Sequence, residues 1–77
     1  MVKEYSEQER ENNFRTFRIF LARLKEEHPN ELRGLGTDQL ASFGFSNETP
    51  FLRIHERVKA DIRIIIHAKW KELFPHL

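Results

Sequence analysis

The segment from Pro50 to Phe74 contains no glycine and no second proline. It begins with a typical helix start, because Thr49 is a good cap and proline is favoured at the first helical position. Pro75 ends the segment. We therefore expect a C-terminal helix of about 25 residues, roughly 37 Å long at about 1.5 Å per residue.

Apolar residues cover about half the circumference of this predicted helix, which is more than a surface helix usually carries. The other predicted segments are too short to cover it along its whole length. Its last part should then be poorly covered, and exposed apolar strips usually mark an interface. We predict that four of its residues bind a partner: Ile64, Trp70, Leu73 and Phe74.

A second long helix is predicted at the N-terminus, from about Ser6 to Glu27. Ser6 and Glu9 have the spacing of a capping box, in which each side chain accepts a hydrogen bond from the other residue's backbone amide. Apolar residues recur at spacings of three and four, which indicates one buried stripe. Pro29 ends the helix, and residues 1–5 should form a flexible N-terminus.

Glycines divide the middle of the chain into short pieces. Gly34 and Gly36 indicate a tight link, Thr37 can cap a short helix, and Gly44 is a typical helix end. We find no strand-like alternation of any length. The sequence therefore predicts an all-α fold in one domain, residues 1–77. It would be a small helical bundle with a long N-terminal helix, one or two short helices and a long C-terminal helix.

The net charge of +1 argues against a general binder of polyanions, which would be strongly basic. No apolar run reaches about 18 residues, so no membrane span is predicted. The N-terminal residues are too polar for a secretory signal peptide, and there is no cysteine for a disulfide. We expect a cytoplasmic protein with no membrane partner.

Sequence signatures of enzymes are missing. There is no glycine-rich phosphate loop, no zinc-protease motif and no nucleophile elbow. The histidines do not fall in pairs three or four apart, which is the spacing that would place two of them on one helix face. We therefore predict no catalytic residue, no metal ligand and no cofactor.

Residues 37–57 resemble a helix-turn-helix motif. Ala41 would lie where two helices cross, Gly44 in the turn and Phe45 in the core, although the motif places alanine and glycine four apart and here they are three apart. The resemblance implies DNA binding through the start of the second helix. The residues that would face DNA are Asn47, Thr49, Arg53 and Arg57.

Two shorter resemblances involve the same region. The stretch "LRGLGTDQL" resembles the glycine hairpin of helix-hairpin-helix DNA binders, but Asp38 would repel a phosphate there. The stretch "LGTDQLASFGF" is similar to the part of SAM-type interaction domains that precedes their last helix. That resemblance covers about 25 residues and implies a long terminal helix that carries the partner surface.

These observations predict a small non-enzymatic regulatory or adaptor protein that acts by protein–protein interaction. It would form a homodimer through its long C-terminal helix, since symmetric pairing covers an apolar strip without a second partner. The alternative is a helix-turn-helix-like DNA-binding regulator that uses residues 37–57.

Overall fold

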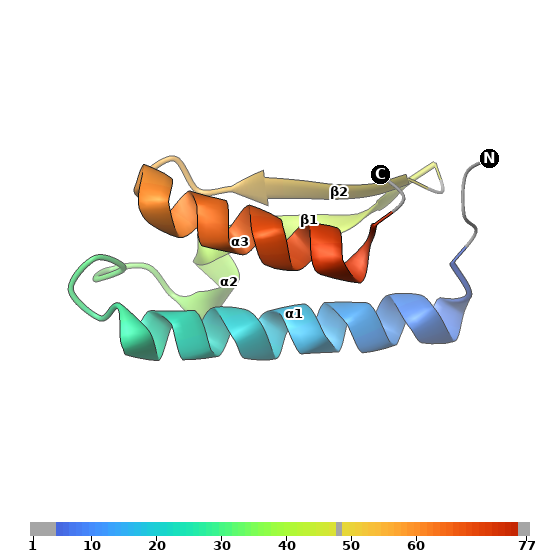
Figure 1. Ribbon diagram of the computed structural model, residues 1–77, viewed down its shortest axis with the longest axis horizontal. Helices are drawn as coiled ribbons and strands as arrows, with labels where there is room; N and C mark the ends of the chain where they lie inside the picture. The colour runs from blue at the N-terminus through green and yellow to red at the C-terminus, as the bar shows by residue number, and fades with distance from the viewer. Residues whose placement is uncertain (1–4, 48, 76–77) are drawn as a thin grey trace.

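The computed structural model describes residues 5–47 and 49–75 of the chain. In these residues the elements are α1 (Glu7–Glu27), α2 (Thr37–Leu40), β1 (Ala41–Ser46), β2 (Thr49–Ile54) and α3 (Ala60–Leu73) (Figure 1). The two strands pair into an antiparallel hairpin. The fold is therefore mixed, and the predicted all-α bundle is wrong.

Helix α1 confirms the prediction from its caps. The Ser6 hydroxyl accepts a hydrogen bond from the Glu9 amide at 3.1 Å, and a Glu9 carboxylate oxygen accepts one from the Ser6 amide at 3.2 Å. At the other end the amide of His28 bonds to the carbonyl of Leu24, and Pro29 follows. Local sequence signals are sufficient here because both ends of the helix are marked by side chains.

Tyr5 is the last residue of the predicted flexible N-terminus. Its side chain is buried, and its ring lies 5.1 Å from the ring of Phe74 and 6.0 Å from that of Phe45, centre to centre. The rest of the predicted flexible segment, residues 1–4, lies outside the described residues.

Helix α2 is a single turn that ends at Leu40 instead of continuing to Gly44. It begins one residue earlier than predicted, with Gly36 as the N-cap, and the Gln39 side chain accepts a hydrogen bond from the Gly36 amide at 2.8 Å. Ala41 then adopts an extended backbone with φ of −153°. Strand β1 starts directly at that residue.

The hairpin replaces both the predicted helix end and the first part of the predicted long helix. Ala41 pairs with Ile54 at its open end and Ser46 with Thr49 beside the turn. Asn47, in the turn, has a φ of 50°, which asparagine tolerates better than most residues. A turn of this kind suits the twist of a two-residue hairpin.

Pro50 is compatible with the strand because of its place in the register. It pairs with Phe45, one step from the Ser46–Thr49 pair that closes the hairpin. In an antiparallel pair, hydrogen-bonded and non-hydrogen-bonded pairs alternate, and the closing pair is hydrogen-bonded. Pro50 therefore occupies a non-hydrogen-bonded pair, where its missing N–H removes no hydrogen bond between the strands.

Helix α3 is shorter than predicted, about 21 Å at about 1.5 Å per residue. A loop of residues 55–59 separates it from β2. Arg63 holds this loop, since its guanidinium donates to the carbonyls of His55 and Val58 at 3.1 and 3.3 Å. The prediction of one helix from Pro50 to Phe74 is therefore wrong in its first ten residues, where the chain forms a strand and a loop.

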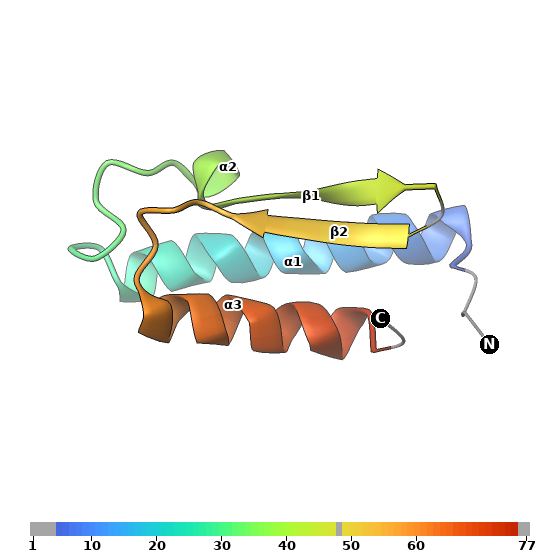
Figure 2. The same cartoon turned by 90° about the horizontal axis from the view of Figure 1, so that it is seen from above.

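The two long helices run in opposite directions, and the strands of the hairpin run along them on one side (Figures 1 and 2). β1 is the strand farther from α3, and β2 lies nearer to it (Figure 2). Alternate residues of both strands face the helices, including Phe43, Phe45 and Leu52, which pack against the core. This arrangement makes two layers, one of helices and one of sheet.

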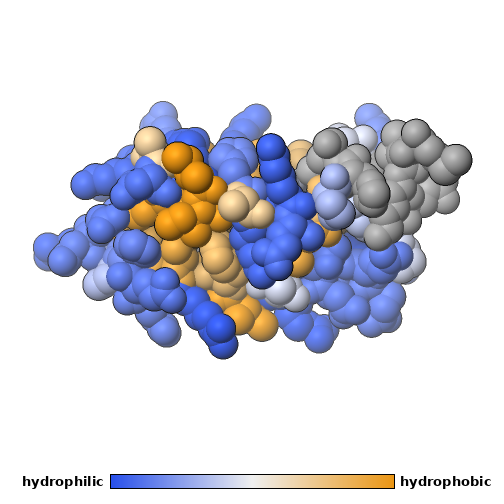
Figure 3. Space-filling view, viewed as in Figure 1, coloured by the Kyte–Doolittle hydropathy of each residue, from blue (hydrophilic) through white to orange (hydrophobic). Residues whose placement is uncertain are grey.

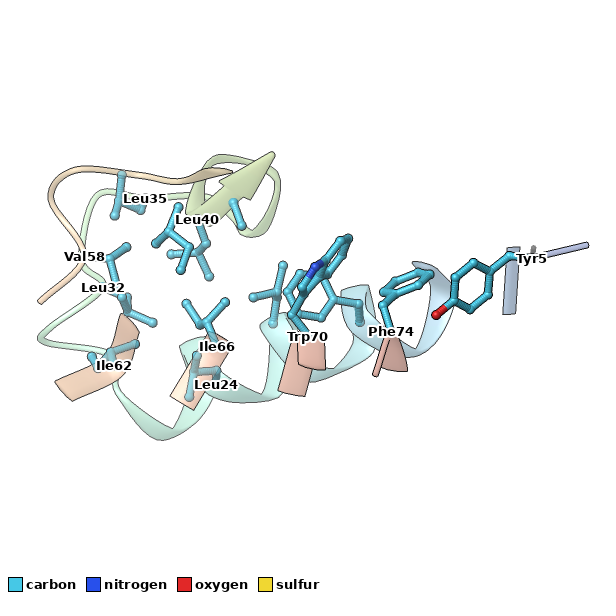
Figure 4. Close-up of a cluster of buried hydrophobic side chains, with 14 residues drawn as sticks. Tyr5, Leu24, Leu32, Leu35, Leu40, Val58, Ile62, Ile66, Trp70 and Phe74 are labelled. Carbon is cyan, nitrogen blue, oxygen red and sulfur yellow. The ribbon is translucent and has the colours of Figure 1, made fainter. Parts of the chain in front are cut away.

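The core changes in character along the molecule (Figure 4). At the end near the N-terminus it is aromatic, and the Trp70 ring lies 5.1 Å from Phe17 and 4.6 Å from Phe74. At the other end it is aliphatic and receives side chains from every layer. The buried aliphatic residues there include Leu24, Leu32, Leu35, Leu40, Val58, Ile62 and Ile66.

Candidate protein interaction surfaces

Three isoleucines form the most exposed apolar surface on the helical layer. Ile64 of α3 is 69% exposed, Ile65 is 40% exposed and Ile19 of α1 is 52% exposed. Figure 3 shows hydrophobic surface gathered over α3 and extending toward α1, with hydrophilic residues around it. We call these three residues the isoleucine patch.

A shallow groove between the two helices adjoins Ile19 of this patch. It is lined by side chains of both helices: Thr16, Ile19, Phe20, Arg23 and Lys69. The ammonium of Lys69 lies 5.9 Å from the centre of the Phe20 ring, so the lysine partly shields an otherwise apolar floor. Ile65 lies one turn before Lys69 on the same side of α3. The patch therefore has members on both helices.

The four predicted partner-binding residues have different positions in the structure. Ile64 is exposed, Leu73 is partly buried against the core, and Trp70 and Phe74 are buried, at 3% and 0% exposure. The premise that the end of α3 is poorly covered is wrong. Phe43 and Phe45 of the hairpin supply the cover.

The residues predicted to face DNA do not lie on a recognition helix. Asn47 is in the hairpin turn, Thr49 and Arg53 alternate on the outer face of β2, and Arg57 lies in the following loop. The backbone amide of Arg57 donates to Nδ1 of His55 at 3.1 Å. The second helix of a helix-turn-helix is replaced by β2, so the geometry behind this alternative is missing.

The outer face of the hairpin carries one exposed aromatic residue that the sequence analysis did not select. Phe51 is 44% exposed and pairs with Gly44 across the hairpin. A Cβ atom on Gly44 would lie 3.2 Å from the Phe51 ring, so the ring packs directly over the glycine backbone. The alternation of Ser42, Gly44 and Ser46 with phenylalanines is the signal that could have revealed this face.

Among residues 5–47 and 49–75, no three His, Cys, Asp or Glu side chains are grouped in a way that could hold a metal ion. In the same residues no helix has the length and apolar character needed to cross a membrane. The predicted absence of catalytic residues and of cofactors stays a prediction.

The mixed two-layer fold and its exposed patch were compared with known proteins. The sequence matches no protein-family model, and neither a curated protein nor a solved structure proved similar to it. The class that the structure itself defines is a small α+β protein in which a β-hairpin covers two antiparallel helices.

Proposed function

We propose that this protein is a non-enzymatic binding protein that acts through protein–protein contacts and self-associates through the isoleucine patch. The observation that carries the proposal is the 69% exposure of Ile64 on α3. A large apolar side chain in a contiguous patch costs free energy in water and is stabilised when a second surface covers it.

The second surface that fits best is another copy of α3 in the opposite direction. If two copies pack antiparallel with the two-fold axis at the level of Ile66, whose own side chain faces the core, Ile64 of one copy lies opposite Ala68 of the other. The small alanine leaves room for the isoleucine. Such a two-fold contact is self-complementary, because the same pair occurs twice.

The charges of α3 favour the same arrangement. Asp61 lies in the first turn and Lys71 in the last turn, and both are exposed. In the antiparallel crossing, Asp61 of one copy lies opposite Lys71 of the other, on each side of the two-fold axis. A parallel crossing would instead place like charges together at both ends.

The size of the patch indicates weak association. Helix α3 is about 21 Å long and a packed helix pair is about 20 Å wide, so each copy offers on the order of 500 Å². Two copies would bury about 1,000 Å² in total, which is at the lower limit for specific interfaces. We therefore expect a dissociation constant in the micromolar range.

Sedimentation equilibrium from about 1 µM to about 1 mM tests the proposal, since this range brackets a micromolar dissociation constant. We expect a monomer at the low end and a dimer at the high end, and the Ile64→Asp variant should stay monomeric. Phe51→Asp is the matched control, because it places the same charge at an exposed apolar residue on the hairpin. It should dimerise like the unmodified protein.

Circular dichroism establishes that both variants are folded before they are compared. A protein that stays monomeric at all concentrations would overturn the proposal. So would an Ile64→Asp variant that dimerises as well as the unmodified chain.

A further inference from the structure

Strand β1 has a free edge on the side opposite β2. The Ser46–Thr49 pair closes the hairpin, so hydrogen-bonded pairs recur at Gly44 and Ser42. The hydrogen bond from His55 to the carbonyl of Leu40, 2.9 Å long, continues this alternation. The backbone N–H and C=O groups of Phe43 and Phe45 therefore point away from β2.

No described residue hydrogen-bonds to these outward-pointing groups of Phe43 and Phe45. β1 is also the strand farther from α3, so α3 does not cover its free edge (Figure 2). Unpaired strand edges are templates for an added strand, and proteins use them to bind extended peptides.

Two hollows that share Arg18 lie near this strand. One is lined by Glu11, Phe14, Arg15 and Arg18 of α1, and the other includes Ala41 and Phe43 of β1. The guanidinium carbon of Arg18 lies 5.6 Å from the centre of the Phe43 ring.

Three arginines of α1 stand along this side of the hairpin. The guanidinium carbon of Arg10 lies 4.2 Å from the centre of the Phe45 ring. Arg10 is therefore nearer the hairpin turn than Arg18, which lies at Phe43. Within residues 5–47 and 49–75, neither Arg15 nor Arg18 takes part in an ion pair. Glu11 and Asp38 also line the two hollows, so their linings together carry two arginines and two carboxylates.

We propose that the edge of β1 binds an extended acidic peptide segment of a partner protein as a third strand. Its backbone would pair with Phe43 and Phe45. Side chains alternate along a strand, so every second residue of the peptide would face α1 and the others would face solvent. Acidic residues at alternate positions, about 7 Å apart, would then reach Arg15 and Arg18.

The partner chemistry follows from Arg15 and Arg18, which form no ion pair with a described residue, and from the backbone. The arginines favour carboxylates, which guanidinium groups bind in bidentate geometry. The edge requires a peptide backbone, because only a strand can satisfy its alternating donors and acceptors. A single-stranded nucleic acid would satisfy the charges but not the edge.

Fluorescence anisotropy tests the proposal with a labelled, end-capped eight-residue peptide in which aspartate alternates with valine. We expect saturable binding to the unmodified protein, together with shifts of the Phe43 and Phe45 amide signals in NMR spectra. The same peptide N-methylated at alternate residues cannot pair along β1 and should bind at least tenfold more weakly. A peptide with lysine in place of aspartate should not bind.

Variants of the protein test the charges. Arg15→Glu and Arg18→Glu should each weaken binding at least fivefold. Arg23→Glu is the matched control, because Arg23 lies on the same helix but lines the groove on the other side, beside Lys69. It should bind the peptide as the unmodified protein does.

Several results would overturn the proposal. These are the absence of binding at about 1 mM protein, equal binding of the N-methylated peptide, or equal binding by the Arg15→Glu and Arg18→Glu variants. Binding of an oligothymidylate as tight as that of the peptide would also overturn it. The test is independent of self-association, because a monomeric Ile64→Asp protein should still bind the peptide.

Discussion

The side-chain amide of Asn13 donates a hydrogen bond to the backbone carbonyl of Leu73, with 3.1 Å between nitrogen and oxygen. Asn13 lies in the second turn of α1 and Leu73 is the last residue of α3. Carbonyls in the last turn of a helix have no partner within that helix. The asparagine therefore caps α3 from outside and fixes the relative position of the two helices.

We expect Asn13→Ala to lower the free energy of unfolding by about 1–2 kcal/mol, because the carbonyl is partly buried and loses its donor. For a chain of this size the midpoint of thermal unfolding should fall by roughly 4–8 °C per kcal/mol. Thermal unfolding followed by circular dichroism measures the change. Asn12→Ala, at the exposed neighbouring position, is the control and should shift the midpoint little. Equal midpoints for both variants would contradict the capping role.

The single tryptophan reports on the core directly. Trp70 is 3% exposed and is surrounded by aromatic rings, so its emission should be blue-shifted and protected from iodide quenching. Both properties should disappear in denaturant. The measurement should be made on the Ile64→Asp variant at low concentration, because self-association then cannot bury Trp70. Strong quenching of the folded monomer would place Trp70 at the surface, as the sequence had led us to expect.

The sequence predicted α1 because its ends and its apolar stripe are all local features. It did not predict the hairpin, because Thr49-Pro50 is equally a helix start and the first residues of a strand. Phe51, Ile54 and Val58 also have helical spacing, and short apolar runs of this kind do not distinguish helix from strand. Residues 49–54 form a strand because they pair with β1, and a local sequence pattern does not contain that tertiary contact.

The candidate site was predicted only in part for the same reason. Ile64 was selected correctly as exposed, since it lies outside the apolar arc of its own helix. Trp70 and Phe74 are buried and not poorly covered as expected, because the side chains that cover them come from a strand that had been assigned to helix and turn. The free edge of β1 was missed entirely, since an edge exists only once its strand is recognised.

The turn residue Asn47 distinguishes the hairpin from the helix pair that the sequence suggested. Its φ of 50° is strained for β-branched residues and accessible to glycine. We expect Asn47→Gly to leave the free energy of unfolding nearly unchanged and Asn47→Val to lower it by about 1–2 kcal/mol. Chemical denaturation of both variants measures this difference. If valine were tolerated as well as glycine, the backbone at residue 47 would not have a positive φ.

Charge exchange on α3 tests the geometry of the proposed dimer separately from its existence. In the antiparallel crossing, Asp61 of each copy lies opposite Lys71 of the other. Asp61→Lys alone, or Lys71→Asp alone, therefore brings like charges together twice in every dimer. At about 0.7 kcal/mol for each affected pair, within the usual range for exposed ion pairs, each single variant should dimerise about tenfold more weakly.

The double variant Asp61→Lys, Lys71→Asp restores opposite charges at both places, so its dissociation constant should return close to that of the unmodified protein. Sedimentation equilibrium at low ionic strength measures all four proteins, because salt screens exposed pairs. Each exchange also places a charge unfavourably against the dipole of α3, which lowers monomer stability, so thermal unfolding must first show that every variant is folded. Recovery of dimerisation in the double variant cannot result from the helix dipole, because both substitutions are unfavourable to that dipole. A double variant weaker than either single one would mean that the two α3 helices do not cross antiparallel around Ile66.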